Sequence, residues 1–274
     1  MRRILIANHH KHAAFTLVEI SVALVVLSII LTGLLPFVTE SQRSNNQRDT
    51  IERLDKAEDA LLAYAIKEGH FPCPAHGATT VHSSNFGVAG GGTDADADCM
   101  DAAVHSTWQT SSGDLVAFGS LPSRTLGLPD EFAFDGWKRR INYMISLDSI
   151  DDGSLAAMDA GVIEVGPSRT TEAVYAIWSS GPNGHGGFMP SGARHNGKSS
   201  NTDELDNCAC TNNGSGGGTQ DEKLVSNLAS DGASPYDDIT RFYTREQLQV
   251  KASGVASSGG GGGGGSTGWV FGVF

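Results

Sequence analysis

An apolar run near the N-terminus constrains this chain more than any other feature. Residues 15–38 read FTLVEISVALVVLSIILTGLLPFV, a run long enough to cross a bilayer core of roughly 30 Å as a helix. Arg2, Arg3 and Lys11 precede it without any acidic residue, so the positive-inside rule places the N-terminus in the cytosol. A secretory signal fits poorly, because its apolar region spans about 7–15 residues and ends at a small-x-small site. We therefore predict a leader at 1–14, a transmembrane helix at 15–38 and an exported remainder.

One carboxylate, Glu19, interrupts this apolar run. A charged group costs about 2.5–3.5 kcal/mol at the middle of a bilayer and less near its surface. One interpretation is that Glu19 marks the edge of the span, among the lipid headgroups. The other is that a positive charge neutralises it, because a carboxylate in apolar surroundings gains most from a partner charge.

Residues 14–20, AFTLVEI, resemble the cleavage and methylation site of type IV prepilins and type II secretion pseudopilins. In that family a prepilin peptidase cuts before the Phe and methylates the new amine, and the Glu at the fifth mature position pairs with the amine of a neighbouring subunit. The resemblance implies cleavage between Ala14 and Phe15, N-methylation of Phe15 and an assembly role for Glu19. It departs from the family at Ala14, where Gly is usual. Pro36 falls where many pilins have a helix-kinking proline.

The helical pattern continues in amphipathic form over residues 39–70. Apolar residues recur there every three or four positions, at Ile51, Leu54, Ala57, Leu61 and Tyr64. We expect the other faces to be covered by charged residues, namely Glu52, Arg53, Lys56, Glu58 and Asp59. Gly69 and Pro72 are stop signals. The pattern predicts one helix of roughly 50 residues, apolar all round in its first half and amphipathic in its second.

After residue 70, we predict an exported globular domain at 71–250 and a Gly-rich flexible tail at 251–274. Candidate strands lie at 115–118, 141–146, 161–165 and 174–178. No long helical pattern alternates with them, so an antiparallel sheet is expected. Residues 71–113 and 181–218 read as Gly-rich loops, and 221–228 and 244–250 as short helices. The predicted fold class is α+β and pilin-like, with the long N-terminal helix packed on a small antiparallel sheet.

Four longer blocks also resemble recurring segments of a subgroup of large prepilin-like proteins. They lie at 60–75, 119–145, 173–186 and 236–248. That subgroup has no established enzymatic activity, so this resemblance informs fold and class alone.

The four cysteines, Cys73, Cys99, Cys208 and Cys210, lie on the predicted exported side, where disulfides form. Three pairings are possible. We favour Cys73–Cys99, which joins the end of the helix to a Gly-rich loop and is typically worth roughly 3 kcal/mol. Cys208 and Cys210 are separated by one residue, a strained spacing for a mutual bridge. A zinc site is the alternative, but the ligand spacings match no standard pattern.

The acidic residues include a D-x-D-x-D run, formed by Asp94, Asp96 and Asp98. Such a run can wrap calcium, and some major pseudopilins bind calcium in their globular domain. The EF-hand template fails here, because its Gly position is Cys99 and its closing Glu position is His105. A solvated acidic loop is the preferred interpretation, and no metal is expected. Asp237 and Asp238 form a second calcium candidate.

The charge balance argues against a nucleic-acid-binding protein, and the absence of a catalytic pattern argues against an enzyme. The net charge of −12 argues against a nucleic-acid partner, because phosphate binding needs clustered Lys and Arg. Ser179, Ser180 and His185 lack an assignable acid partner, and the only G-x-S-x-G match, at 264–268, lies in the glycine run. We expect neither enzymatic activity nor a cofactor.

The sequence therefore predicts a structural or assembly subunit, more specifically a minor subunit of a type IV pilus or a type II secretion system. Its partners would be other pilin-like subunits, the prepilin peptidase and the bacterial inner membrane. The rival hypothesis is a singly anchored periplasmic binding protein that does not polymerise.

Overall fold

The structure of the chain is a computed structural model. It describes residues 16–90, 99, 106–109, 115–147, 158–167, 169–195, 201–208, 223–227, 230 and 236–258, and for 33–39, 106–109, 223 and 255–258 the backbone alone. The chain forms two compact units, residues 1–45 and residues 46–274.

A single long helix, α1, spans Leu17–Glu68 and contains 52 residues, which confirms the prediction of one helix of roughly 50 residues. It ends two residues earlier than expected because Gly69 adopts a positive φ of 84° and donates its N–H to the carbonyl of Ala65 at 3.0 Å. Glycine adopts this left-handed conformation without a steric penalty, so it commonly ends a helix. In the part of the chain that the structure describes, no helix combines the length and apolar character that crossing a membrane requires. The predicted transmembrane span at 15–38 is therefore not confirmed.

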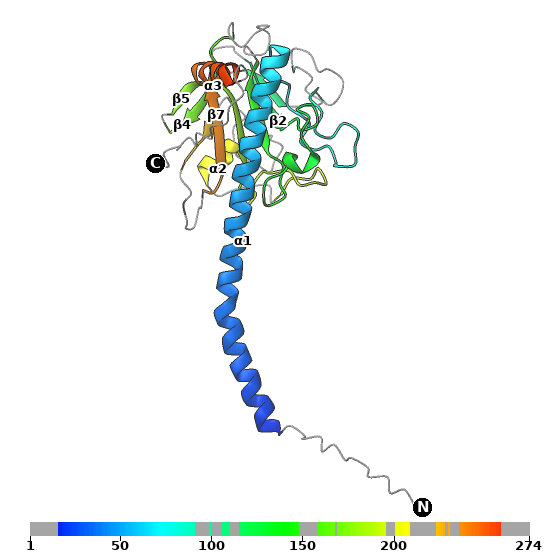
Figure 1. The fold of residues 1–274 in the computed structure, drawn as a ribbon, viewed down its shortest axis with the longest axis vertical. Coiled ribbons are helices and arrows are strands. Elements are labelled where there is room, and N and C mark those ends of the chain that lie inside the picture. The colour runs from blue at the N-terminus through cyan, green and yellow to red at the C-terminus, as the bar shows by residue number, and fades with distance from the viewer. Residues whose placement is uncertain are drawn as a thin grey trace, which may run out of the picture. The chain divides into compact units, whose positions relative to one another are not determined.

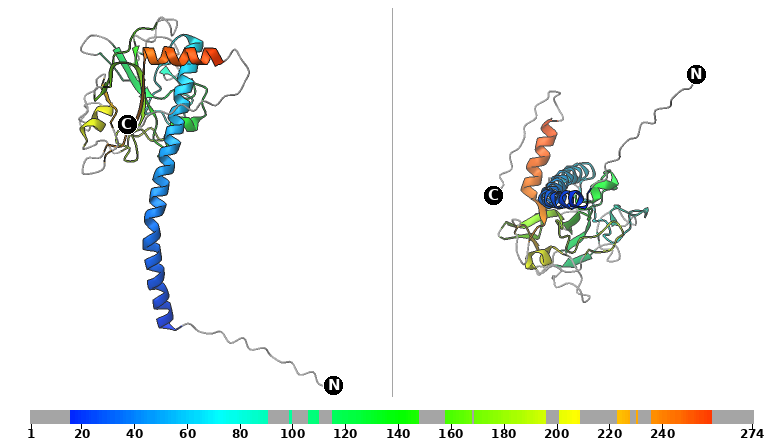
Figure 2. Two further views of the ribbon diagram at one scale, coloured as in Figure 1. Left: turned by 60° about the vertical axis from the view of Figure 1, so that its left-hand side comes forward. Right: turned by 90° about the horizontal axis from the view of Figure 1, so that it is seen from below.

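The second unit contains a curled, mostly antiparallel sheet (Figures 1 and 2). Its strands follow the order β1-β2-β3-β5-β4-β6, and β7 pairs with β5 beside this path. Among the described strands, every pairing is antiparallel except that of β4 with β6. The strands are β1 (Ser106–Gln109), β2 (Leu115–Ser120), β3 (Asn142–Ser146), β4 (Ile163–Gly166), β5 (Thr170–Ser179), β6 (Lys223–Val225) and β7 (Ile239–Thr244).

Three short helical elements accompany the sheet: the 3-10 helix η2 (Asp130–Ala133), α2 (Thr202–Asn207) and α3 (Arg245–Ser258). The predicted helix at 244–250 is thus real but longer. The helix predicted at 221–228 is wrong, because three of its residues form β6 alongside β4. The four predicted strands are confirmed as β2, β3, β4 and β5, whereas β1, β7 and α2 were not predicted.

The sheet separates two hydrophobic clusters because successive side chains of a strand point to opposite faces. In β3, Tyr143 and Ile145 belong to the cluster that also contains Leu54 and Leu61 of α1. Met144, between them, belongs to the cluster on the other face. The C-terminal half of α1 and the helix α3 lie on the same face of the sheet (Figure 2).

A close approach fixes α1 against the loop that precedes β3. Thr50 accepts the Gly136 N–H at 2.9 Å through its hydroxyl, and Arg53 donates to the carbonyls of Glu131 and Phe134 at 3.0 and 2.9 Å. A Cβ at Gly136 would lie 2.0 Å from the carbonyl oxygen of Asn46. Only glycine therefore permits this contact.

The first testable prediction concerns Leu61, which is fully buried between α1 and the sheet. The Leu61→Ala substitution is expected to lower the free energy of unfolding by about 2–5 kcal/mol, because it removes buried methyl groups and leaves a cavity. Urea denaturation of the full chain measures this change. The matched control is Lys56→Ala on an exposed face of the same helix, which should change stability by less than about 0.5 kcal/mol. A Leu61→Ala change as small as that of the control would contradict the packing described.

Candidate functional site

The N-terminus of α1 holds Glu19 in a reciprocal capping arrangement. The backbone N–H and the hydroxyl of Thr16 both donate to Glu19 Oε2 at 3.2 Å. In return, the Glu19 N–H donates to the Thr16 hydroxyl oxygen at 3.2 Å. This is a capping box, in which the T-x-x-E spacing lets each side chain satisfy a backbone N–H that the first helical turn leaves without a partner. The carboxylate also lies at the positive end of the helix dipole, where a negative charge stabilises the helix.

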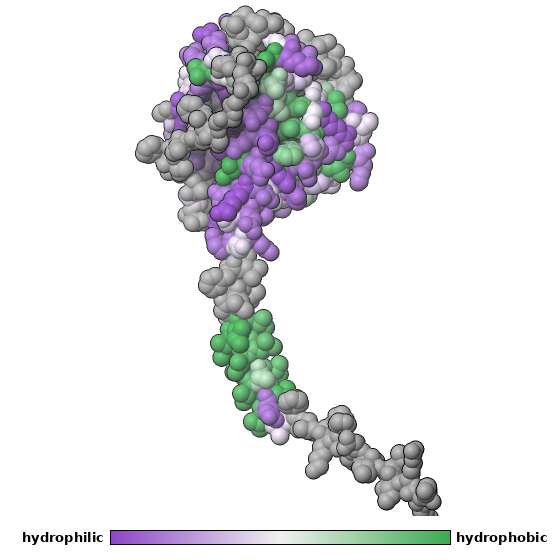
Figure 3. Space-filling view, in the orientation of Figure 1, coloured by the Kyte–Doolittle hydropathy of each residue, from purple (hydrophilic) through white to green (hydrophobic). Residues whose placement is uncertain are grey.

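The face of the helix seen in Figure 3 is apolar directly after Glu19. The large apolar side chains of residues 17–31 are between 50% (Val26) and 86% (Leu17) exposed. The hydroxyl groups in this stretch all donate to carbonyls of the same helix: Ser21 to Val18, Ser28 to Val25 and Thr32 to Ser28. Among residues 17–32, Glu19 is thus the only ionisable group, and the other polar side chains are satisfied within the helix.

Several predicted residues lie outside the described part of the chain. They are Ala14, Phe15, Asp94, Asp96, Asp98, Cys210 and the glycine run at 264–268. Pro36 lies within α1, but its side chain is not described.

The favoured disulfide, Cys73–Cys99, is confirmed. The two Cα atoms are 5.4 Å apart and the bridge closes a separation of 26 residues. Both cysteines are buried and belong to the cluster formed by α1 and the sheet. The bridge therefore ties the segment after α1 to the core. Cys208 is also disulfide-bonded.

The second calcium candidate lies beside a residue that was not predicted, Glu204. One oxygen from each of Glu204, Asp237 and Asp238 lies within 4.8 Å of the others. Asn183 donates to Glu204 and Asn207 donates to Asp238, each at 2.8 Å. Burial raises the pKa of Asp238 well above its usual value. Amide donors therefore stabilise two of these three carboxylates, Glu204 and Asp238.

The serines that were considered for hydrolysis have structural roles. Ser179 donates to Asp135 Oδ2 at 2.6 Å, and Asp135 also accepts the backbone N–H groups of Trp137 and Arg139. Ser180 accepts a hydrogen bond from Asn142. Burial raises the pKa of Asp135 despite these donors. The Ser179 hydroxyl thus holds the loop before β3 through Asp135.

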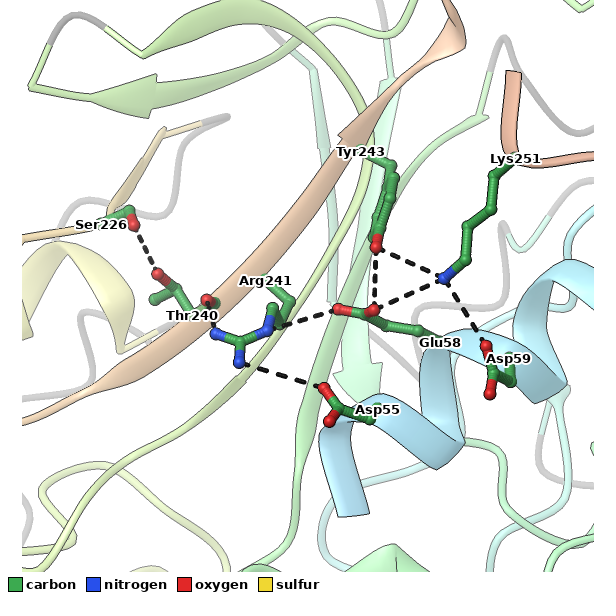
Figure 4. A network of polar contacts seen from close by, with 8 residues as sticks. All are labelled: Asp55, Glu58, Asp59, Ser226, Thr240, Arg241, Tyr243 and Lys251. Carbon is green, nitrogen blue, oxygen red and sulfur yellow. Dashed lines mark hydrogen bonds and ion pairs between the residues drawn. The ribbon is translucent and has the colours of Figure 1, made fainter. Parts of the chain in front are cut away.

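A buried carboxylate, Glu58, joins α1 to β7 and α3 (Figure 4). It is 6% exposed and accepts the Tyr243 hydroxyl at 2.8 Å through Oε2. Arg241 Nε lies 3.6 Å from its Oε1, and Lys251 Nζ lies 3.6 Å from its Oε2. Lys251 also lies 3.6 Å from Asp59. We refer to Glu58, Tyr243, Arg241 and Lys251 as the Glu58 cluster.

The prediction that Glu58 lies on a polar face of the helix is wrong. It follows Leu54 by four residues and precedes Leu61 by three, so it shares their buried face. Burial raises its pKa above the usual value of 4.5, and the Tyr243 hydrogen bond and the charges of Lys251 and Arg241 oppose this rise. The free-energy cost of removing the ionised carboxylate from water therefore exceeds the stabilisation that Tyr243, Lys251 and Arg241 provide.

Comparison with known proteins identifies the N-terminal segment. Residues 9–35 match the family model of the prokaryotic N-terminal methylation motif, which is the signature of prepilins and pseudopilins. The resemblance seen in residues 14–20 is thus confirmed. The motif is structural, not catalytic, and suggests a membrane-anchored type IV pilin-like or pseudopilin subunit. No curated protein and no solved structure matches the chain.

The second testable prediction concerns the pH dependence of stability. Because the folded-state pKa of Glu58 is raised above 4.5, its stabilising contribution is present below that pH and is lost as the pH rises through the folded-state pKa. Glu58→Gln retains an acceptor for Tyr243 but carries no charge. The melting temperature of the variant, relative to the unchanged protein, should therefore increase as the pH rises above 4.5.

Thermal unfolding followed by circular dichroism at a series of pH values measures this difference. Glu52→Gln, on an exposed face of α1, is the matched control and should follow the unchanged protein at every pH. If the Glu58→Gln curve also runs parallel to that of the unchanged protein, the inferred penalty for burying the charge is wrong.

Proposed function

We propose that this protein is a structural subunit of a type IV pilus or a type II secretion pseudopilus. It is cut between Ala14 and Phe15 and N-methylated on Phe15 by a prepilin peptidase. The observation that carries the proposal is the position of Glu19, the one ionisable group of an exposed apolar helix surface, held at the first turn of α1 within the matched motif.

Glu19 has the chemistry to receive the amine of a neighbouring copy. A carboxylate offers about four lone-pair sites, and the capping box directs two donors to a single oxygen, Oε2. The capping contacts also restrict the rotamers of the side chain, so less conformational entropy is lost when a partner binds. Burial of the surrounding apolar surface between subunits removes water and strengthens the ion pair that Glu19 forms with a methylammonium group.

Before assembly, the same apolar surface holds the precursor in the bacterial inner membrane. The cationic residues Arg2, Arg3 and Lys11 remain in the cytosol. The second unit is then periplasmic, and the Cys73–Cys99 bridge supports this side, because disulfides persist in oxidising compartments. We assign the protein as a minor subunit because its predicted Gly-rich loops are large.

The third testable prediction is the identity of the mature N-terminus. Mass spectrometry of the protein purified from cells that contain a prepilin peptidase should find N-methylated Phe15 as the first residue. Cells without the peptidase should yield the leader intact. A chain that retains residues 1–14 in both strains would overturn the proposal and favour an anchored periplasmic binding protein that does not polymerise.

The fourth testable prediction separates the charge of Glu19 from its capping role. Glu19→Gln keeps an acceptor for Thr16 but removes the charge, and Glu19→Ala removes both. Because hydrogen bonds to charged partners are worth about 1.5–3 kcal/mol, each variant should reduce incorporation into filaments by about tenfold or more. Immunoblotting of sheared filaments against the membrane fraction measures incorporation.

Glu40→Gln is the matched control, because Glu40 is another exposed carboxylate on α1, and it should incorporate normally. Loss in Glu19→Ala alone would mean that the capping contact matters and the charge does not. Normal incorporation of both Glu19 variants would eliminate the assembly role.

A further inference from the structure

Tyr243 of β7 lies at the outer end of a row of three tyrosine rings. Its ring stacks on that of Tyr175 with the centroids 5.6 Å apart, and the ring of Tyr175 meets that of Tyr143 at 6.3 Å. Tyr143 and Tyr175 are at most 1% exposed, whereas Tyr243 is partly exposed. The row therefore connects the buried core, ring to ring, with the surface of the second unit.

The hydroxyl of Tyr243 differs from that of Tyr143 in the group that accepts its hydrogen bond. It donates to Glu58 Oε2 at 2.8 Å, a distance at which a proton can pass directly between two groups. Tyr143 instead donates to the carbonyl oxygen of Pro72 at 3.0 Å, and a carbonyl is not basic enough to hold a proton. Because burial raises the pKa of Glu58 above 4.5, its carboxylate is a better proton acceptor than that of an ordinary glutamate.

Lys251 opposes a positive charge on the Tyr243 ring. Its Nζ lies 4.9 Å from the ring centroid and donates to the phenolic oxygen at 3.4 Å (Figure 4). An oxidised tyrosine that kept its proton would be cationic, and the ammonium group would repel it. A neutral phenoxyl radical would not be repelled and would keep the hydrogen bond from Lys251. The site therefore favours loss of an electron and a proton together.

Tyr243 keeps its proton until the ring loses an electron. Burial and the negative charge of Glu58 raise the pKa of Tyr243 above its usual value. Oxidation turns the phenol into a strong acid, and transfer of its proton leaves Glu58 neutral in a site where burial disfavours the charged form. The burial that penalises the glutamate charge in the resting protein thus favours the oxidised state.

We propose that Tyr243 is a redox-active tyrosine, on which a radical localises when the second unit is oxidised. A one-electron oxidant, such as a small inorganic radical, takes one electron from the ring. The O–H bond of Tyr243 breaks, and the proton bonds to Glu58 Oε2. The products are a neutral tyrosyl radical, a protonated Glu58 and the reduced oxidant. A radical formed first at Tyr143 or Tyr175 would oxidise Tyr243 through the neighbouring rings, so the buried core is spared.

The fifth testable prediction uses oxidation of the full chain by photogenerated tris(bipyridine)ruthenium(III) at about pH 8, where carboxylates are normally ionised and tyrosine is not. The unchanged protein should give a tyrosyl radical, recognised by its visible absorption and its electron paramagnetic resonance spectrum. Tyr243→Phe keeps the ring and should lose most of this signal. The matched control, Tyr236→Phe, removes a hydroxyl that donates to the Val225 carbonyl at 2.6 Å and should leave the signal unchanged.

Glu58→Gln tests the proton transfer itself. It keeps an acceptor for the Tyr243 hydroxyl but cannot take the proton, so radical formation should slow by at least about tenfold. The rate in this variant should rise with the concentration of phosphate buffer, which supplies an external base, whereas the rate in the unchanged protein should not. Glu52→Gln, on an exposed face of α1, should behave as the unchanged protein does.

Equal rates of radical formation in Glu58→Gln and in the unchanged protein would overturn the proposal. Spin trapping followed by mass spectrometry of peptides should place the adduct on Tyr243. An adduct on the half-buried residues Trp137 or Tyr64, with none on Tyr243, would also overturn it. None of these measurements involves filament assembly, so the proposed function and the redox role of Tyr243 can fail independently.

Discussion

The packing of the last turns of α1 against the sheet is the interaction on which the second unit depends. Leu54, Ala57, Leu61 and Ala65 are completely buried there. Two glycines next to this stretch are also restricted in which residue can replace them. Gly136 allows the loop before β3 to touch the helix backbone, and Gly69 ends the helix where the chain must turn toward Cys73. Leu248 of α3 belongs to the same hydrophobic cluster as Leu54 and Leu61 of α1, so the two helices cover one face of the sheet together.

Two carboxylates of α1, Glu58 and Glu19, lie in apolar surroundings but differ in where their partners come from. Glu58 is buried within the molecule and its partners, Tyr243, Arg241 and Lys251, are supplied by the same chain. Glu19 lies on an apolar surface that its own molecule leaves exposed, and its hydrogen bonds come from Thr16. An intramolecular charge cluster fixes a fold, whereas a carboxylate on an uncovered apolar surface is suited to an intermolecular partner.

The periodic and short-range features of this chain could be predicted from its sequence, and the long-range features could not. The length of α1, four strands and the Cys73–Cys99 bridge follow from apolar spacing, turn residues and cysteine positions. The capping box was visible in the T-x-x-E spacing of Thr16 and Glu19, and the burial of Glu58 was visible in its spacing from Leu54 and Leu61. Strand β7 is different, because its sequence, ITRFYT, mixes charged and aromatic residues and becomes a strand only through pairing with β5. The three-residue β6 was mistaken for a helix for the same reason, since its parallel partner β4 is distant in the sequence.

The contacts between α1 and the rest of the second unit also determine how that unit responds to mechanical load. Arg53, Leu54, Glu58 and Leu61 are spread over more than two turns of the helix. Arg53 contacts the loop before β3, Glu58 contacts β7, and the two leucines pack into the hydrophobic cluster. Tension along the helix axis would therefore load these contacts in parallel, as in shear, and not one after another, as in peeling. Because contacts loaded in parallel must break together, the helix can be pulled from one end without being stripped progressively from the sheet.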